Sequence, residues 1–82
     1  MGSLRSVLGK NVAGVRRLAG LTQEQLAEQT GYSVDFIGLI ERGINAPTLD
    51  RLEDIARELK TEPWQLLRPT SVGKRLSRGS SK

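Results

Sequence analysis

The chain has 82 residues, with 13 lysines and arginines against nine aspartates and glutamates, which gives a net charge of +4 at neutral pH. This length accommodates one domain with one modest hydrophobic core. The absence of cysteine and histidine excludes disulfides and thiolate or imidazole catalysis, and it argues against a zinc site. No apolar run reaches membrane-spanning length and the N-terminus lacks a signal-peptide core, so we expect a cytoplasmic protein that does not enter a membrane.

Charge is distributed unevenly along the chain. Residues 1–20 carry four basic side chains and no acidic one, whereas residues 21–62 hold all nine acids and only four basic side chains. Residues 63–82 then carry five basic side chains and no acid. This pattern favours a molecule with one face that neutralises phosphates and another that faces solvent or a partner, although charge alone is also typical of an ordinary solvated surface.

A first helix is predicted from about residue 4 to residue 19, because apolar residues recur at steps of four, three and four. These residues are Leu8, Val12, Val15 and Ala19. Gly9 and Gly14 fall inside the same stretch, and each weakens an isolated helix by roughly 1 kcal/mol relative to alanine. We therefore expect this helix to need tertiary packing and to end at Gly20.

A stretch near the middle of the chain contains signals for two short helices joined by a tight turn. Thr22 and Gln25 form a capping box at the start of the first helix, and Gly31 tolerates the positive φ that ends it. Ser33 follows at once as the cap of the second helix. The two predicted helices span about residues 23–30 and 34–42.

The spacing of five residues in this stretch places the two helices in a particular register. The positions follow one another at steps of four, four, six and three, with a small residue where the helices cross and a glycine in the turn. The residues are Gln23, Ala27, Gly31, Ile37 and Ile40. This register is typical of the helix-turn-helix, whose second helix lies in the major groove of DNA. An ordinary helical hairpin is the alternative.

Two further helices are predicted towards the C-terminus. Thr48 caps a helix of about residues 49–60, whose buried side is expected to carry an apolar stripe. The stripe consists of Leu49, Leu52, Ile55, Ala56 and Leu59. A short fifth helix is predicted at about residues 63–67, where a proline occupies the first position. Residues 68–82 are rich in serine, glycine and basic side chains, so we expect a disordered basic tail after a domain of residues 1–67.

The sequence also resembles a known family, the Xre/Cro-type regulators, in the segments LTQEQLAEQTG, SVDFIGLIERG and APTLDRLEDIARELK. That family includes phage repressors, Cro proteins and the controller proteins of restriction–modification systems. The resemblance covers roughly Leu8 to Leu67. It implies an all-α, compact five-helix lambda-repressor-like DNA-binding domain with its helix-turn-helix at the second and third helices. It also implies a dimer that binds a two-fold symmetric operator.

The candidates for contact with the major groove lie at the start and along the outer side of the third helix: Ser33, Val34, Asp35, Gly38 and Leu39. Ser33 can bond a base or a phosphate, or serve only as the cap. Val34 and Leu39 can pack on a thymine methyl, and Asp35 can accept from a cytosine amino group or repel phosphate. Because this set is poor in hydrogen-bond donors, we expect few direct base contacts and more reading of DNA shape.

The candidates for contact with DNA phosphates are Gln23, Arg42, Asn45, Arg16 and Arg17. The resemblance implies a phosphate contact for Gln23, while the residues at and after the end of the third helix fit one by position. The resemblance also implies that Arg16 pairs with Glu41, and we weigh this structural role above direct DNA contact. Arg17 is a phosphate partner or plain surface.

Three apolar residues follow the fourth helix and cannot all face one small core: Trp64, Leu66 and Leu67. We expect at least one of them to serve a two-fold dimer interface, with Trp64 covering the end of the core as the alternative. A dimer is expected because one helix-turn-helix reads only a half-site, and two copies on adjacent major grooves lie about 34 Å apart.

A sequence-specific transcriptional regulator, acting as repressor or activator, is the function that these features favour. An antitoxin that regulates its own operon and holds a toxin is one alternative, and a protein-interaction module that has lost DNA binding is another. The sequence shows no catalytic dyad, metal cluster or phosphate loop, so we expect neither an enzyme nor a cofactor. The expected partners are double-stranded DNA and a second copy of the chain, with RNA polymerase or another regulator as a further candidate.

Overall fold

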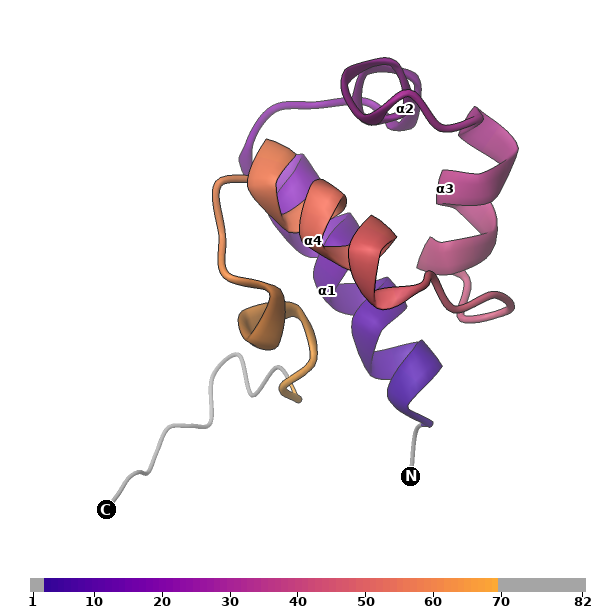
Figure 1. The fold of residues 1–82 in the computed structure, drawn as a ribbon, viewed down its shortest axis with the longest axis vertical. Helices are drawn as coiled ribbons and strands as arrows, with labels where there is room; N and C mark the ends of the chain where they lie inside the picture. The colour runs from indigo at the N-terminus through magenta and orange to yellow at the C-terminus, as the bar shows by residue number, and fades with distance from the viewer. Residues whose placement is uncertain (1–2, 70–82) are drawn as a thin grey trace.

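The computed structural model describes residues 3–69, and within this range the chain forms four α-helices, one short 3-10 helix and no strand (Figure 1). The elements are α1 (Leu4–Leu18), α2 (Gln23–Thr30), α3 (Val34–Glu41), α4 (Leu49–Glu58) and η1 (Pro63–Leu66). The four predicted α-helices are confirmed, each within two residues of its expected end. The expected disordered tail of residues 68–82 lies, from residue 70 onward, outside the described residues.

At the predicted short fifth helix the structure has η1, a four-residue 3-10 helix, so a count of five α-helices is not confirmed. The hydrogen bonds of η1 join residues three apart, from Gln65 N–H to the Glu62 carbonyl at 3.0 Å and from Leu67 N–H to the Trp64 carbonyl at 3.1 Å. The buried side chain of Asn11 on α1 donates to the carbonyl of Leu66 at 2.8 Å. This bond holds η1 against α1.

Each α-helix begins with a hydroxyl side chain that accepts from a backbone N–H of its first turn. The caps are Ser3, Thr22, Ser33 and Thr48, with distances of 3.0 to 3.2 Å. The three caps expected from the sequence are confirmed, and Thr22 and Gln25 form the complete capping box. Gly31 ends α2 at φ 81°, in the left-handed region that glycine adopts without strain.

The core lies where α3 packs against α1 and α2, α4 packs against α2, and η1 closes against α4 and α1. It is formed by Leu8, Val12, Leu26, Ala27, Ile37, Ile40, Leu52, Ile55, Ala56, Leu59 and Leu66. Two residues expected on the buried side are exposed. Ala19 follows the last turn of α1, and Leu49 is the first residue of α4, one turn before its core contacts begin at Leu52.

None of the helices within residues 3–69 is both long and apolar enough to cross a lipid bilayer.

Gly9 occupies the point where α1 and α3 cross. A Cβ atom at this position would collide with the carbonyl oxygen of Ile40 and would lie 2.6 Å from that of Glu41. Real side chains do not approach backbone oxygens so closely, so the crossing requires glycine. A Cβ atom at Gly14, also inside α1, would meet nothing within 4 Å.

These two glycines predict opposite stability changes. Gly9→Ala should destabilise the fold by about 1–3 kcal/mol, because α3 must move away from α1. Gly14→Ala should stabilise it by about 0.5–1 kcal/mol, because alanine favours the helix and meets no neighbour. Urea unfolding followed by circular dichroism measures both variants, and equal changes at the two positions would contradict the close crossing.

Candidate nucleic-acid interface

The unit formed by α2, the turn at Gly31 and α3 lies at one side of the domain, with α3 along its outer edge (Figure 1). The Gly31 N–H donates to the carbonyl of Ala27 at 2.8 Å and thereby closes α2. Ala27 is buried beneath the crossing, and Ile37 and Ile40 are fully buried on the inner side of α3. The register expected from the sequence is therefore present in three dimensions.

The outer side of α3 carries the residues expected to face the groove. Val34, Asp35, Gly38 and Leu39 fall on one face, since helical residues four apart lie above one another. Val34 and Asp35 are exposed, while Gly38 and Leu39 are half-buried. Ser33 accepts from the Phe36 N–H at 3.1 Å as the cap, and its hydroxyl proton remains available to donate.

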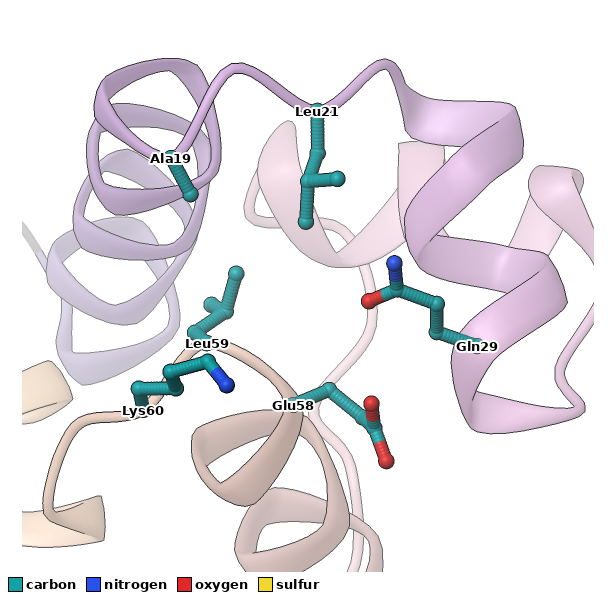
Figure 2. Close-up of a pocket in the computed structure, with 6 residues that line it drawn as sticks. All are labelled: Ala19, Leu21, Gln29, Glu58, Leu59 and Lys60. Carbon is teal, nitrogen blue, oxygen red and sulfur yellow. The ribbon is translucent and has the colours of Figure 1, made fainter.

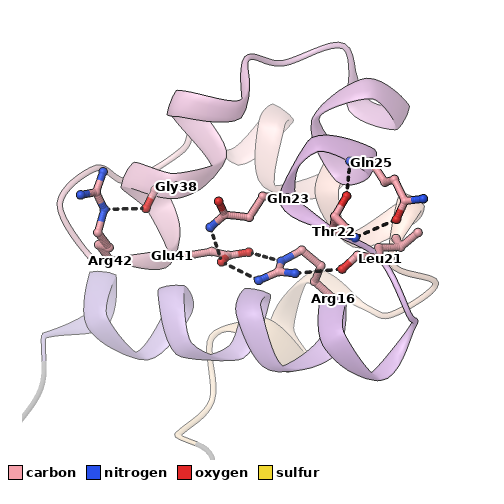
Figure 3. Close-up of polar contacts among 8 residues, drawn as sticks. All are labelled: Arg16, Leu21, Thr22, Gln23, Gln25, Gly38, Glu41 and Arg42. Carbon is pink, nitrogen blue, oxygen red and sulfur yellow. Dashed lines mark hydrogen bonds and ion pairs between the residues drawn. The ribbon is translucent and has the colours of Figure 1, made fainter.

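An ion pair beneath α3 connects three parts of the domain (Figure 3). Arg16 of α1 donates from Nε to Glu41 Oε2 at 2.6 Å and from Nη2 to Oε1 at 3.1 Å. Its Nη1 donates to the carbonyl of Leu21 at 2.8 Å. Gln23, the first residue of α2, donates from Nε2 to Glu41 Oε1 at 2.9 Å. The end of α3 is thus fixed to α1 and to the start of α2.

Burial makes this pair a structural contact. The side chains of Arg16 and Glu41 are 10% and 6% exposed, and all three guanidinium nitrogens of Arg16 are engaged. The hydrogen bond to Glu41 raises the pKa of Arg16 above its ordinary value. The pairing implied by the resemblance is present, and this geometry leaves Arg16 turned inward. Gln23 keeps one N–H of its amide for a contact outside the domain.

The remaining phosphate candidates lie at the surface. Arg42 is exposed at the end of α3, where its Nε donates to the carbonyl of Gly38 at 3.3 Å. Asn45 is exposed in the loop that follows, which is held by hydrogen bonds from its own N–H and that of Ile44 to the Leu39 carbonyl. Arg17 is exposed in the last turn of α1, outside the α2–α3 unit.

The sequence profile of the family HTH_3, described as Helix-turn-helix, matches residues 13–63. The chain belongs to this helix-turn-helix family. The matched region contains α2, the turn, α3 and α4 in full, together with the C-terminal part of α1 from residue 13 onward.

Individual relatives agree with the family match. The HTH-type transcriptional regulator y4dJ of Sinorhizobium fredii, itself uncharacterized, is 36% identical over 67 residues, which span 82% of this chain and 87% of that protein. The crystal structure of a hypothetical transcription factor NHTF from Neisseria aligns with a TM-score of 0.80 and 32% identity, over 87% of this chain and 82% of that one.

A third match is the restriction–modification controller protein C.AhdI from Aeromonas hydrophila, which aligns with a TM-score of 0.73 and 31% identity over 76% of this chain and 94% of that one. The resemblance to Xre/Cro-type regulators is confirmed by these matches, and the chain is a member of a family of DNA-binding transcriptional regulators.

In this helix-turn-helix domain, the three residues expected at a dimer interface have different surroundings. Leu66 is fully buried in the core, so its side chain cannot reach a partner, and that part of the expectation is corrected. Trp64 is 58% exposed, with the guanidinium of Arg68 lying 5.9 Å from the centre of its ring. Leu67 is half-buried. Of the three, Trp64 and Leu67 remain available to a second copy.

A cluster that the sequence did not reveal joins the start of α3 to α4. Tyr32 donates from its hydroxyl to Asp54 Oδ2 at 2.6 Å, and its ring packs edge-on against Phe36 at 5.5 Å between centroids. The Arg51 guanidinium lies 5.5 Å and 5.3 Å from the centroids of these two rings. Arg57 completes the cluster with an ion pair to Asp54 Oδ1 at 3.0 Å. The four-residue spacing of the two aromatic residues was its only signal in the sequence.

A hollow of 260 Å³ lies on another part of the helix-turn-helix domain, between the end of α1, the helix α2 and the end of α4 (Figure 2). It is lined by Ala19, Leu21, Gln29, Glu58, Leu59 and Lys60. No lining residue belongs to α3, so a small molecule in this hollow would not touch the outer face of that helix.

The ion pair beneath α3 predicts a large loss of stability for Glu41→Gln. This change leaves the Arg16 guanidinium buried against a neutral amide, and removing one partner of a buried pair costs about 3–5 kcal/mol. Urea unfolding gives the loss. Glu28→Gln on the exposed side of α2 is the matched control and should change stability by less than about 0.5 kcal/mol. Similar values for the two variants would show that the pair does not hold α3.

The Tyr32–Asp54 hydrogen bond predicts a pH dependence. Donation from Tyr32, followed by the Arg57 contact, lowers the pKa of Asp54 below its ordinary value. Asp54 therefore contributes stability that is present above its unfolded pKa of about 3.9 and is lost as the pH falls through its folded pKa. Tyr32→Phe should raise the Asp54 pKa and weaken this acid-dependent loss.

Carbon-13 NMR titration of the Asp54 carboxyl measures the pKa directly. Arg57→Gln is the comparison, and it should also raise the pKa of Asp54, since the hydrogen bond and the charge of Arg57 both lower it. An unchanged Asp54 pKa in Tyr32→Phe would contradict the role given to the tyrosine.

Proposed function

We propose that this chain is a sequence-specific transcriptional regulator that binds a two-fold symmetric operator as a dimer, with α3 in the major groove. The observation that supports the proposal is that one side of α3 is buried in the core while the other side is exposed. Ile37 and Ile40 are fully buried on its inner side, while Val34 and Asp35 are exposed on the other. A helix fixed in this way presents a defined surface to a groove wide enough to admit it.

Contacts with bases and phosphates divide between two sets of residues. Val34 and Leu39 offer apolar contact with thymine methyl groups, and Asp35 offers an acceptor for a cytosine amino group. Gln23, Arg42 and Asn45 supply the phosphate contacts, which set the position of the helix without reading the sequence. Their placement at the start of α2 and after the end of α3 suits phosphates on either side of one groove.

A dimer is supported by the exposed apolar surface at η1. Trp64 is the largest exposed apolar side chain among the described residues, and Leu67 lies three positions further on, half-buried. Two-fold pairing through this surface would bury the ring of Trp64. Tryptophan commonly contributes much of the binding energy of an interface. The pairing then places two copies of α3 on successive half-sites of the operator.

The decisive experiment selects bound duplexes from a random DNA pool at near-physiological salt and reads them by sequencing. We expect a palindrome whose half-sites lie about one helical turn apart, because a two-fold dimer presents two equivalent recognition helices. A folded protein that enriches no sequence would overturn the proposal and would favour a protein-interaction module instead.

The dimer is examined separately with Trp64→Ser. Sedimentation velocity should show the variant as a monomer at concentrations where the wild type is a dimer, and the variant should bind the palindrome at least about tenfold more weakly. Leu18→Ser is the matched control, since Leu18 is 90% exposed at the end of α1 and away from η1. Equal behaviour of the two variants would place the interface elsewhere.

A further inference from the structure

Gly38 stands in the middle of α3, where glycine has no structural reason to be. Glycine lowers helix stability relative to alanine at an interior position. A Cβ atom here would lie 4.0 Å from Arg42 Nη2 and 4.0 Å from Gln23 Oε1, which is ordinary contact distance. The backbone at this position is an ordinary part of α3 and not among the positive-φ glycines. The contrast with Gly9, where a Cβ atom would collide with α3, shows that packing does not demand the glycine at 38.

The missing side chain leaves a gap on the outer face of α3. Val34 lies one turn before Gly38 and Arg42 one turn after it, so the three share one row of the helix. Figure 3 shows Gly38 with Arg42 on one side and Gln23 on the other. We call this gap the Gly38 gap: the surface of Gly38 bounded by Val34, Arg42 and Gln23.

The polar groups on the two sides of the Gly38 gap differ: the Arg42 guanidinium, with Nη2 4.0 Å from the Cβ position, can contact a phosphate, whereas the others are engaged or unsuited to an anion. The Gly38 carbonyl accepts from the backbone N–H of Arg42 at 3.0 Å and from its Nε at 3.3 Å. Gln23 turns its amide oxygen towards the gap, because its nitrogen donates to Glu41. If the Gln23 amide were turned the other way, its oxygen would lie against the carboxylate oxygen of Glu41 and the two would repel each other. An amide oxygen repels a phosphate oxygen, so the part of the gap beside Gln23 suits a small apolar group, while the Arg42 guanidinium on the other side is left for the DNA backbone.

In the major groove the small apolar group is the 5-methyl group of thymine. We propose that Gly38 is a specificity-determining residue, which admits a thymine methyl against the α3 backbone beside the side chain of Val34. The inference rests on the proposed function, in which α3 occupies the major groove. Any side chain at position 38 would fill the volume that the methyl takes.

The experiment begins with the operator obtained by selection with the wild type. Each thymine of one half-site is replaced in turn by uracil, which differs only in lacking the methyl group. At one thymine the wild type should lose about fourfold in affinity, the effect expected for one buried methyl-sized group. Gly38→Ala should bind the thymine duplex more weakly than the wild type does and should prefer uracil at that same position, because its own methyl occupies the gap.

Gly14→Ala is the matched control, since it also adds a methyl group to a helix where a Cβ atom meets no neighbour, but on α1. Both alanine variants should melt about 2–8 °C above the wild type, because alanine favours each helix. Only Gly38→Ala should change the preference between thymine and uracil. Weaker binding by a more stable protein cannot be attributed to unfolding.

Two results separate the inference from the function on which it rests. A selected operator whose thymines can all be replaced without loss would overturn the role of Gly38 alone, as would an equal loss in the wild type and Gly38→Ala. A folded wild type that selects no duplex would overturn the proposed function and the inference together.

Discussion

The buried contact between Arg16 and Glu41 fixes α3, and the arrangement of the helix-turn-helix depends on it. Removing a guanidinium and a carboxylate from water is costly, and only good geometry with further hydrogen bonds offsets that cost. Here the carboxylate receives two bonds from Arg16 and one from Gln23, and the third nitrogen of the guanidinium reaches the carbonyl of Leu21. The contact therefore sets the position of α3 relative to both α1 and α2.

The two ends of α3 are held by different means. At its end, Glu41 is joined to Arg16, and the close crossing at Gly9 brings the last carbonyls of α3 against the backbone of α1. At its start, the Tyr32 hydroxyl binds Asp54 of α4, which is more exposed and more accessible to water. Side chains on the outer face take no part in either attachment, apart from the local bond of Arg42 to its own helix.

The sequence predicted the local features of this domain well, because these features depend on residues that are close together along the chain. Helix caps at Thr22, Ser33 and Thr48 and the inward pair Ile37 and Ile40 require only positions close along the chain. The pairing of Arg16 with Glu41 came from family resemblance, since no local pattern connects residues 25 positions apart.

What the sequence could not predict depends on where elements meet. From the sequence alone, Gly9 only weakens a helix. In the structure α3 crosses α1 at this residue, and the close approach requires glycine. The apolar periodicity predicted that Leu49 is buried, but the apolar stripe of α4 begins one turn before the part of the helix that contacts the core, so Leu49 is exposed. Leu66 is buried in the 3-10 helix η1, and its carbonyl accepts a hydrogen bond from the side chain of Asn11, which lies 55 positions earlier in the sequence. In each case the deciding neighbour is distant in sequence.

The exposed position of Trp64 has a practical consequence, because it is the only tryptophan in the chain. Indole fluorescence shifts to shorter wavelengths when the ring leaves water. The chain therefore carries an intrinsic optical reporter at the surface where two copies are proposed to meet. Its emission can be followed during dilution or on addition of DNA without attaching any dye.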